Sequence, residues 1–307
     1  MSLLDTPLRE LFGVQFPIVQ APMANNAPPA LAAAVSAAGA LGSIAGATLS
    51  ADELRAEIRV VREATDRPFA VNLFAPPYLR EETLAVVLDA RPRVCSFSFG
   101  ILDPAPLRDA GIVTLGTATT AEETRALEQA GVDAVVVQGA EAGGHRGSFL
   151  DGFPLVPLVE LVPASVDAVS VPVVAAGGIM DGAGAAAALR LGAAGVSLGT
   201  AFLFTPEAER PPEHLETLRS LETVVTDAYT GRPMRAARTP VLEELMAGPP
   251  PLPFPDQREV SAKKGPLFMG GTSAAQGREL DAAELVRLLV AEAGSAGLGE
   301  RAEWPQA

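Results

Sequence analysis

The sequence predicts an α/β fold: a (β/α)8 TIM barrel with a smaller irregular and helical cap after the eighth strand. From Phe16 to Leu203, short β-branched runs alternate with amphipathic stretches rich in Ala, Leu and Glu. Most of the short runs are apolar on both faces, as parallel strands covered by helices are. A doubly wound open sheet would show the same periodicity, because the pattern does not reveal closure. The placement of glycines, described below, favours the barrel.

Eight strands are expected, each an apolar run bounded by turn-forming residues. In chain order they are Pro17–Ala21, Leu41–Ala45, Phe69–Leu73, Val94–Phe99, Ile112–Gly116, Ala134–Gln138, Pro172–Ala176 and Gly195–Gly199. Helical periodicity is clear between them over Ala51–Ala64, Ala121–Ala130 and Gly184–Leu191. Gly131 and Gly192 lie at the ends of the last two helices, where a C-cap favours a residue that tolerates positive φ.

The rhythm of the sequence changes after Leu203, which indicates a second structural unit. The cap is expected to pack over the C-terminal mouth of the barrel, with one helix at His214–Thr223 and a proline-rich segment, "GPPPLPFPDQ". A final amphipathic helix, Ala282–Ala293, is expected to return to the barrel. The predicted division is residues 1–204 plus 281–294 for the barrel, 205–280 for the cap and 295–307 for a flexible tail.

Composition excludes several classes of function. The 307 residues are 48% hydrophobic and 20% charged, which is typical of a globular α/β protein. A net charge of −14 argues against nucleic acid or an anionic membrane surface as a partner. No apolar run reaches the roughly 20 residues of a membrane helix, and the N-terminus lacks the apolar core of a signal peptide.

The single cysteine, Cys95, excludes an intramolecular disulfide and a cysteine-based zinc site. We therefore expect a cytoplasmic protein in which Cys95 behaves as a small core hydrophobe.

Glycines follow two consecutive strands of the predicted barrel. Gly177-Gly178 comes after the seventh strand, and Gly199-Thr200 ends the eighth. In many barrels these two loops hold a ligand phosphate on backbone N–H groups. Glycines after strands can also simply make turns, but two such pairs in consecutive units favour a phosphate site and hence a barrel.

The loop after the sixth strand, "QGAEAGGHRG" (Gln138–Gly147), is the most informative segment. A barrel places it at the catalytic face, and Gly143 and Gly144 would let the backbone approach a ligand closely. The imidazole of His145 suits proton transfer or a hydrogen bond to an anion. The alternative is a loop histidine bound to a neighbouring carbonyl group.

Three other polar residues have weaker indications. Arg146 either contacts a phosphate or anionic substrate or forms a surface ion pair, and Glu141 could orient the loop. His214, the second histidine, lies between Glu213 and Glu216 in a charged helix and is expected to be solvated.

Six segments together resemble the nitronate monooxygenase (2-nitropropane dioxygenase) family. They run in order from about residue 12 to 210, with a weaker echo in "TGRPMRAARTPVLEE". The segments are "VQAPMA" (Val19–Ala24), "AVNLF" (Ala70–Phe74), "GTATTAEE" (Gly116–Glu123), "QGAEAGGHRG" (Gln138–Gly147), "PVVAAGGIMDG" (Pro172–Gly182) and "GAAGVSLGTAFL" (Gly192–Leu203).

The resemblance implies FMN at the barrel mouth, no metal, and His145 as the catalytic residue. Backbone beside the flavin ring would come from the first segment, side-chain contacts from the second and fourth, and phosphate contacts from the last two. Together with the loop glycines, the expected cofactor-binding residues are Ala21, Pro22, Met23, Asn72, Gln138, Gly143, Gly144, Gly177, Gly178, Gly199 and Thr200.

The implied activity is oxidation of a nitronate or nitroalkane with dioxygen to a carbonyl compound and nitrite. The alternatives are an FMN-dependent NAD(P)H enoyl or quinone reductase on the same fold, a flavin-free barrel enzyme related to inosine-monophosphate dehydrogenase, and a non-catalytic flavin-binding protein. The expected partners are a small-molecule substrate and dioxygen, and a homodimer remains open.

Some positions depart from the family pattern. Asn25-Asn26 replaces the usual glycines, Ser98 stands where some members have a second histidine, and "SAAQG" (Ser273–Gly277) stands where the family reads "WAGQG". With only Tyr78 and Tyr229 present, a tyrosine-lined pocket cannot form. We therefore leave open a larger substrate than the usual nitronate.

Overall fold

The computed structural model describes residues 3–150 and 152–296, so most of the predicted tail lies outside the described residues. Within them, eight parallel strands form one sheet and confirm the predicted barrel strands to within two residues at each end. The strands are β1 (Ile18–Gln20), β2 (Gly42–Ile44), β3 (Phe69–Phe74), β4 (Val94–Ser98), β5 (Val113–Ala118), β6 (Ala134–Gln138), β8 (Val173–Ala176) and β9 (Gly195–Leu198).

Contacts between β1 and β2 join the two ends of this sheet. The strand order runs β1-β9-β8-β6-β5-β4-β3-β2, and a parallel bridge links Val19 to Leu41. Leu41 N–H donates to Ile18 O, and Gln20 N–H donates to Leu41 O, both at 2.9 Å. The buried Gln20 side chain adds a third link, since its Oε1 accepts from Ser43 N–H at 2.8 Å. The sheet is thus a barrel and not a doubly wound open sheet.

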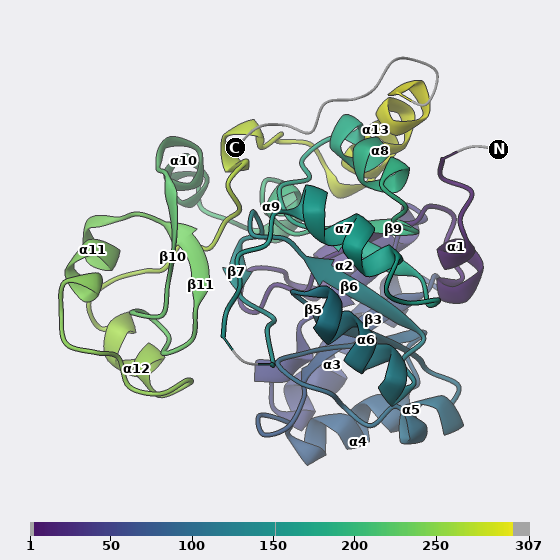
Figure 1. The fold of residues 1–307 in the computed structure, drawn as a ribbon, viewed down its shortest axis with the longest axis horizontal. Helices are drawn as coiled ribbons and strands as arrows, with labels where there is room; N and C mark the ends of the chain where they lie inside the picture. Colours follow the sequence, from purple (N-terminus) through teal and green to yellow (C-terminus); the bar gives the residue numbers. More distant parts are fainter. Residues whose placement is uncertain (1–2, 151, 297–307) are drawn as a thin grey trace.

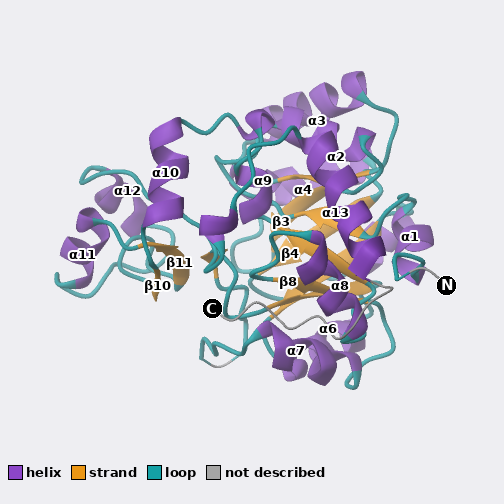
Figure 2. Ribbon diagram, turned by 90° about the horizontal axis from the view of Figure 1, so that it is seen from above, coloured by secondary structure: helices purple, strands orange, loops and turns teal. Residues whose placement is uncertain are grey.

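Helices surround the barrel, as Figure 2 shows from above. α3 and α6 have the predicted bounds. The last described helix, α13, packs against α8 (Figure 1). The barrel helices are α1 (Pro7–Phe12), α2 (Pro29–Ala37), α3 (Ala51–Ala64), α4 (Glu81–Ala90), α5 (Ala105–Asp109), α6 (Ala121–Ala130), α7 (Leu158–Val166), α8 (Gly182–Arg190), α9 (Thr200–Leu203) and α13 (Ala282–Ala296). No helix among the described residues is long and apolar enough to cross a membrane.

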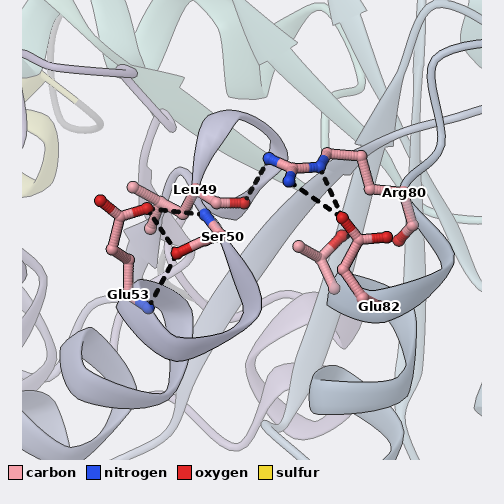
Figure 3. Close-up of polar contacts among 6 residues, drawn as sticks. Leu49, Ser50, Glu53, Arg80 and Glu82 are labelled. Carbon is pink, nitrogen blue, oxygen red and sulfur yellow. Dashed lines mark hydrogen bonds and ion pairs between the residues drawn. The ribbon is translucent and has the colours of Figure 1, made fainter.

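A capping box sets the start of α3 (Figure 3). Ser50 Oγ accepts from Glu53 N–H at 3.3 Å, while the Glu53 carboxylate accepts from Ser50 N–H at 2.7 Å. These bonds satisfy donors that a helix N-terminus otherwise leaves free, and they hold the pKa of Glu53 below its usual value. Arg80 pairs with Glu82 and donates to Leu49 O at 2.8 Å, so it ties this turn to the loop after β3.

The short helix α1 closes the N-terminal end of the barrel. Leu8 and Phe12 are fully buried and belong to one cluster with inward-facing residues of the strands, such as Val19, Val94 and Val174. Because this end is filled by hydrophobic side chains, a ligand must enter at the opposite end, where the strands have their C-termini.

The cap contains a sheet that the sequence did not predict. β10 (Thr223–Thr226) and β11 (Met234–Ala237) form an antiparallel hairpin, and β11 also pairs with β7 (Gly144–His145) in the loop after β6. The cap helices are α10 (Pro212–Ser220), α11 (Pro240–Met246) and α12 (Gln257–Ala262). In Figure 1 the cap stands beside the barrel, with β10 and β11 on the side that faces β7.

Two predictions for α10 were wrong. The helix ends at Ser220 and not at Thr223, because the β-branched run that begins at Thr223 forms β10. His214 is not solvated: its side chain is buried beside Phe268, with ring centroids 4.8 Å apart. His214 and Leu218 are one helical turn apart and share the inward face, in spite of their charged neighbours.

The prediction for Cys95 is confirmed. Its side chain is fully buried in β4, and burial raises the pKa of the thiol to about 12. The thiol is therefore neutral at physiological pH and acts as a small apolar group.

The close contact between β2 and α2 makes Gly42 a sensitive position. A Cβ atom at Gly42 would overlap the carbonyl group of Ala32, and backbone cannot move aside as a flexible side chain could. We expect Gly42→Ala to lower the free energy of unfolding by about 2 kcal/mol or more, measured by urea denaturation. Gly294→Ala is the control, because it has open space within α13 and should stabilise the protein by up to about 1 kcal/mol. Equal stability of the two variants would contradict this account.

Candidate active site

The predicted cofactor-binding residues lie at the C-terminal ends of five barrel strands. Ala21, Pro22 and Met23 follow β1, Asn72 lies in β3, Gln138 ends β6, and the two glycine pairs follow β8 and β9. A Cβ at Gly199 would lie 3.5 Å from Ala21 Cβ and 3.6 Å from Met23 Sδ, which places the loops after β1 and β9 in direct contact. The structure thus brings residues from distant parts of the sequence to one end of the barrel.

The loops after β8 and β9 are glycine-containing and partly exposed at the barrel mouth. Gly177 has φ +129° and Gly178 has φ +69°, so both adopt backbone conformations that other residues rarely take. Gly199 directly precedes α9, a short additional helix of the kind whose N-terminus binds phosphate in many barrels. These three glycines and Thr200 are all partly exposed. We call these two loops the glycine cradle.

The N-terminus of the neighbouring helix α8, by contrast, is already occupied by carboxylates. Asp181 Oδ1 accepts from Gly184 N–H, and Glu292 Oε2 from α13 accepts from Gly182 N–H, both at 2.8 Å. These two donors are therefore used within the protein. Among the described helices after β8 and β9, α9 is the one whose start remains suited to an anion.

Gly143 and Gly144 both lie against other segments of the protein backbone. A Cβ at Gly143 would overlap the backbone of Gly270 and lie 2.6 Å from Gly271 N. Gly271 N–H in turn donates to Thr200 Oγ1 at 2.9 Å. Gly144, with φ +78°, pairs with Arg235 in the cap sheet. The segment at 270–271 thus connects the loops after β6 and β9.

The side chains of Asn72 and Gln138 both form hydrogen bonds with other protein groups at the barrel mouth. Gln138 Nε2 donates to His145 O at 2.9 Å, and its Oε1 accepts from Gly147 N–H at 2.8 Å. Gln138 therefore holds the backbone on both sides of Arg146. Asn72 is nearly buried and donates to Ser96 Oγ at 3.1 Å.

Neither alternative proposed for Arg146 is correct. Its side chain is fully buried, and it donates to Gly139 O at 2.7 Å and to Gln138 O at 2.9 Å. Burial lowers the pKa of Arg146 to about 10, so the guanidinium stays charged at neutral pH. Arg235 adds two bonds to Ala140 O, at 3.0 and 2.8 Å. The loop after β6 is thus held by arginines that bind its carbonyl groups.

Two carboxylates bind backbone N–H groups on either side of this loop. The buried Glu123 accepts from Thr119 N–H at 2.6 Å and from the N–H groups of Phe149 and Leu150 at 2.6 and 3.0 Å. Glu141 accepts from Leu158 N–H at 3.1 Å, at the start of α7. The suggestion that Glu141 orients the loop thus agrees with its contact to α7, whereas the role of Glu123 was not foreseen.

His145 lies under a group of aromatic side chains. Its ring centroid is 5.9 Å from that of Phe99 and 5.4 Å from that of Phe254, both in edge-on geometry. Phe74 and Tyr78 pack against the same two phenylalanines. Phe99 has φ +72°, which is uncommon for a bulky residue and typical of functional sites. We call Phe74, Tyr78, Phe99 and Phe254 the aromatic wall.

This environment keeps His145 uncharged. Burial, together with the positive charges of Arg232 and Arg258, lowers the pKa of the imidazole to about 3. Since the folded-state pKa lies below the ordinary value of 6.5, the ring is neutral at every pH above about 4. His145 is thus a neutral hydrogen-bonding group at physiological pH.

Thr230 determines which nitrogen of His145 carries the proton. His145 Nε2 lies 3.1 Å from Thr230 Oγ1, and the same hydroxyl lies 2.9 Å from Arg232 O. A carbonyl group only accepts, so the single Thr230 proton is donated to Arg232 O. Nε2–H of His145 therefore donates to Thr230 Oγ1, and Nδ1 is left as an acceptor.

Sequence reasoning missed Thr230, Arg232, Phe99 and Phe254 as parts of the site. The "TGRP" segment, Thr230–Pro233, was noted as an echo of the family, and that was the available signal for the first two.

A groove of about 470 Å³ beside α10 contains none of the predicted site residues. No group of residues in the described parts could hold a metal ion.

The fold and the site together define a (β/α)8 barrel with a glycine cradle and a neutral histidine at its mouth. A model of the nitronate monooxygenase family matches residues 5–292. The chain belongs to the nitronate monooxygenase family, a family of flavin-dependent oxidoreductases that oxidise nitronates.

Individual relatives agree with this assignment. A nitronate monooxygenase of Pseudomonas aeruginosa is 41% identical, over 92% of this chain and 97% of its own length. A probable nitronate monooxygenase of Staphylococcus aureus is 37% identical, over 83% and 84%. Among solved structures, nitroalkane oxidase from Streptomyces ansochromogenes superposes with a TM-score of 0.88 at 38% identity, covering 95% of this chain and 99% of that one. FabK from Thermotoga maritima has a TM-score of 0.83 at 30% identity, covering 95% and 97%.

We expect Glu123→Gln to loosen the segment that follows His145. The amide replaces one acceptor oxygen by a donor, so at least one buried N–H group loses its partner. The free energy of unfolding should fall by about 2 kcal/mol, and hydrogen exchange should quicken at residues 149–150. Glu122→Gln, at the exposed neighbouring position, is the matched control. Unchanged exchange in Glu123→Gln would rule out its role in holding the loop.

The His145 pKa can be measured directly, because the chain has two histidines. We expect the imidazole of His145 to stay neutral from pH 8 down to pH 5 in NMR spectra of protein with labelled histidine. His214→Gln assigns the signals. A midpoint near 6.5 would contradict the proposed environment.

Proposed function

We propose that this protein oxidises a nitronate with dioxygen, using FMN, to a carbonyl compound and nitrite. The supporting observation is a neutral histidine beneath an aromatic wall, at the same barrel mouth as a glycine cradle suited to phosphate. When bound, FMN would supply the redox chemistry by accepting electrons from the substrate and passing them to dioxygen.

FMN would be held by the residues that the family resemblance named. The backbone at Gly177, Gly178 and Gly199 would bind the phosphate, together with the start of α9 at Thr200. Ala21, Pro22, Met23, Asn72 and Gln138 would lie beside the ring system, whereas Gly143 and Gly144 would support the loop from behind. We propose FMN and not FAD because the described residues offer one such cradle for a phosphate group at the barrel mouth.

The state of His145 favours a preformed nitronate over a neutral nitroalkane as the substrate. A general base is most effective when its pKa is near the working pH, and a base with a pKa of about 3 takes a proton from carbon poorly. A neutral imidazole can still donate one hydrogen bond. An anion at Nδ1 would favour the other tautomer, in which the Thr230 proton turns from Arg232 O to Nε2 and Nδ1–H of His145 donates to a nitronate oxygen.

A second candidate is an FMN-dependent NAD(P)H enoyl or quinone reductase. The observation in its favour is the similarity to FabK, at 30% identity over nearly the whole chain. The enoyl reductase domain of MlnA from Bacillus amyloliquefaciens, at 17% identity and a TM-score of 0.63, shares the fold alone. Oxidation of NADH would distinguish this candidate.

The decisive experiment mixes the purified, FMN-loaded protein anaerobically with ethyl nitronate and, separately, with NADH. We expect the nitronate to bleach the flavin absorbance and nitrite to appear on aeration. Rapid bleaching by NADH alone would favour the reductase. Failure to bind FMN at all would overturn both candidates.

His145→Ala tests the proposed hydrogen bond in the same assay. Because the variant loses a donor aimed at the substrate, kcat with the nitronate should fall by about 10²- to 10³-fold while FMN stays bound. His214→Ala is the control, because His214 packs in the cap beside Phe268, outside the aromatic wall. An unchanged kcat in His145→Ala would remove His145 from the mechanism.

A further inference from the structure

Arg232 is a buried cation beside His145. Its side chain is 8% exposed, and the guanidinium carbon lies 4.0 Å from the centroid of the Phe99 ring, in cation–π geometry. Nε donates to Arg146 O at 3.2 Å, and a second nitrogen donates to Ser148 O. Phe99 also packs against His145, so the two polar groups contact the same aromatic ring.

The hydrogen-bond partners of Arg232 are electrically neutral. They are the carbonyl groups of Arg146 and Ser148 and the hydroxyl of Tyr78. Among the described residues, no carboxylate oxygen lies within 4.0 Å of this guanidinium, although Arg219, Arg238 and Arg278 each have one. The opposite charge of the buried Glu123 acts on Arg232 from a longer distance. Because a buried charge without a directly bound counter-ion is costly, an anion closer than Glu123 would be stabilised by this guanidinium.

Aromatic rings flank this cation. Phe99 of the aromatic wall contacts both Arg232 and His145, and the centroid of the Phe153 ring lies 5.4 Å from the guanidinium carbon. In such surroundings a charge acts over a longer distance than in water. The effect is visible on His145, whose pKa the Arg232 charge helps to lower. An anion next to His145 would be stabilised by the same charge.

We propose that Arg232 is a specificity-determining residue that selects an anionic nitronate with an apolar substituent over the neutral nitroalkane of the same skeleton. The guanidinium attracts the charged end of the substrate, and the aromatic wall receives the apolar part. This inference rests on the proposed function, since both concern the substrate of the same site.

Steady-state kinetics of three variants test the role of the charge. Arg232→Gln removes the charge, Arg232→Lys retains it, and Arg238→Gln removes an exposed charge further along the same hairpin. We expect KM for ethyl nitronate to rise about tenfold or more in Arg232→Gln, and KM for neutral nitroethane to change less than about twofold. Arg232→Lys should recover much of the loss, and Arg238→Gln should match the wild type. Equal rises in KM for both substrates would reduce Arg232 to a structural role.

A binding measurement keeps this test separate from the proposed function. Nitrate is a planar anion with the same O–N–O geometry, and it should shift the NMR signal of His145 in the wild-type protein but not in Arg232→Gln. The pKa of His145 should rise in Arg232→Gln, because a positive neighbour is removed. If nitrate bound in this way but ethyl nitronate were not oxidised, the proposed function would fail and the anion site would stand. Identical nitrate shifts in wild type and Arg232→Gln would overturn the inference.

Discussion

The binding of Arg146 to the carbonyl groups of Gln138 and Gly139 is the interaction on which the active site depends. The loop after β6 carries His145, yet apart from the two residues of β7 it has no regular structure. Its position is set from inside by a fully buried guanidinium and from its sides by Arg235, Glu123 and Gln138. Charged hydrogen-bonding groups thus perform the positioning that a strand ladder performs elsewhere in the barrel.

The site is shared between the barrel and the cap. The loops that follow the barrel strands supply the glycine cradle, the Ala21–Met23 backbone and Phe99, all at one rim. The cap hairpin supplies Thr230 and Arg232, and the proline-rich segment supplies Phe254. Pairing between β7 and β11 joins the two contributions directly at His145. Substrate preference can therefore change through the cap while the cofactor cradle stays the same, which fits the use of one fold by monooxygenases and reductases.

Low polarity around His145 determines what its imidazole can do. Packing against the aromatic wall partly desolvates the imidazole, and the nearby arginines oppose a second positive charge. The histidine is therefore a neutral donor or acceptor, and positive charge is provided by a guanidinium that does not titrate near neutral pH. This division of roles differs from a site in which one histidine is both the base and the cation, and it requires the electrostatics of the whole mouth.

The sequence by itself determined the barrel strands, the bounds of α3 and α6, the two glycine pairs and the position of His145, because each follows from a local pattern or a short motif. It could not determine the buried state of His214, the carbonyl partners of Arg146, the pairing of β7 with β11 or the presence of Thr230 and Arg232 in the site. Periodicity reports which way a residue faces within its own element and says nothing of what packs against it. Thr230 is 85 residues from His145 along the chain, and only the folded cap brings their side chains within 3.1 Å.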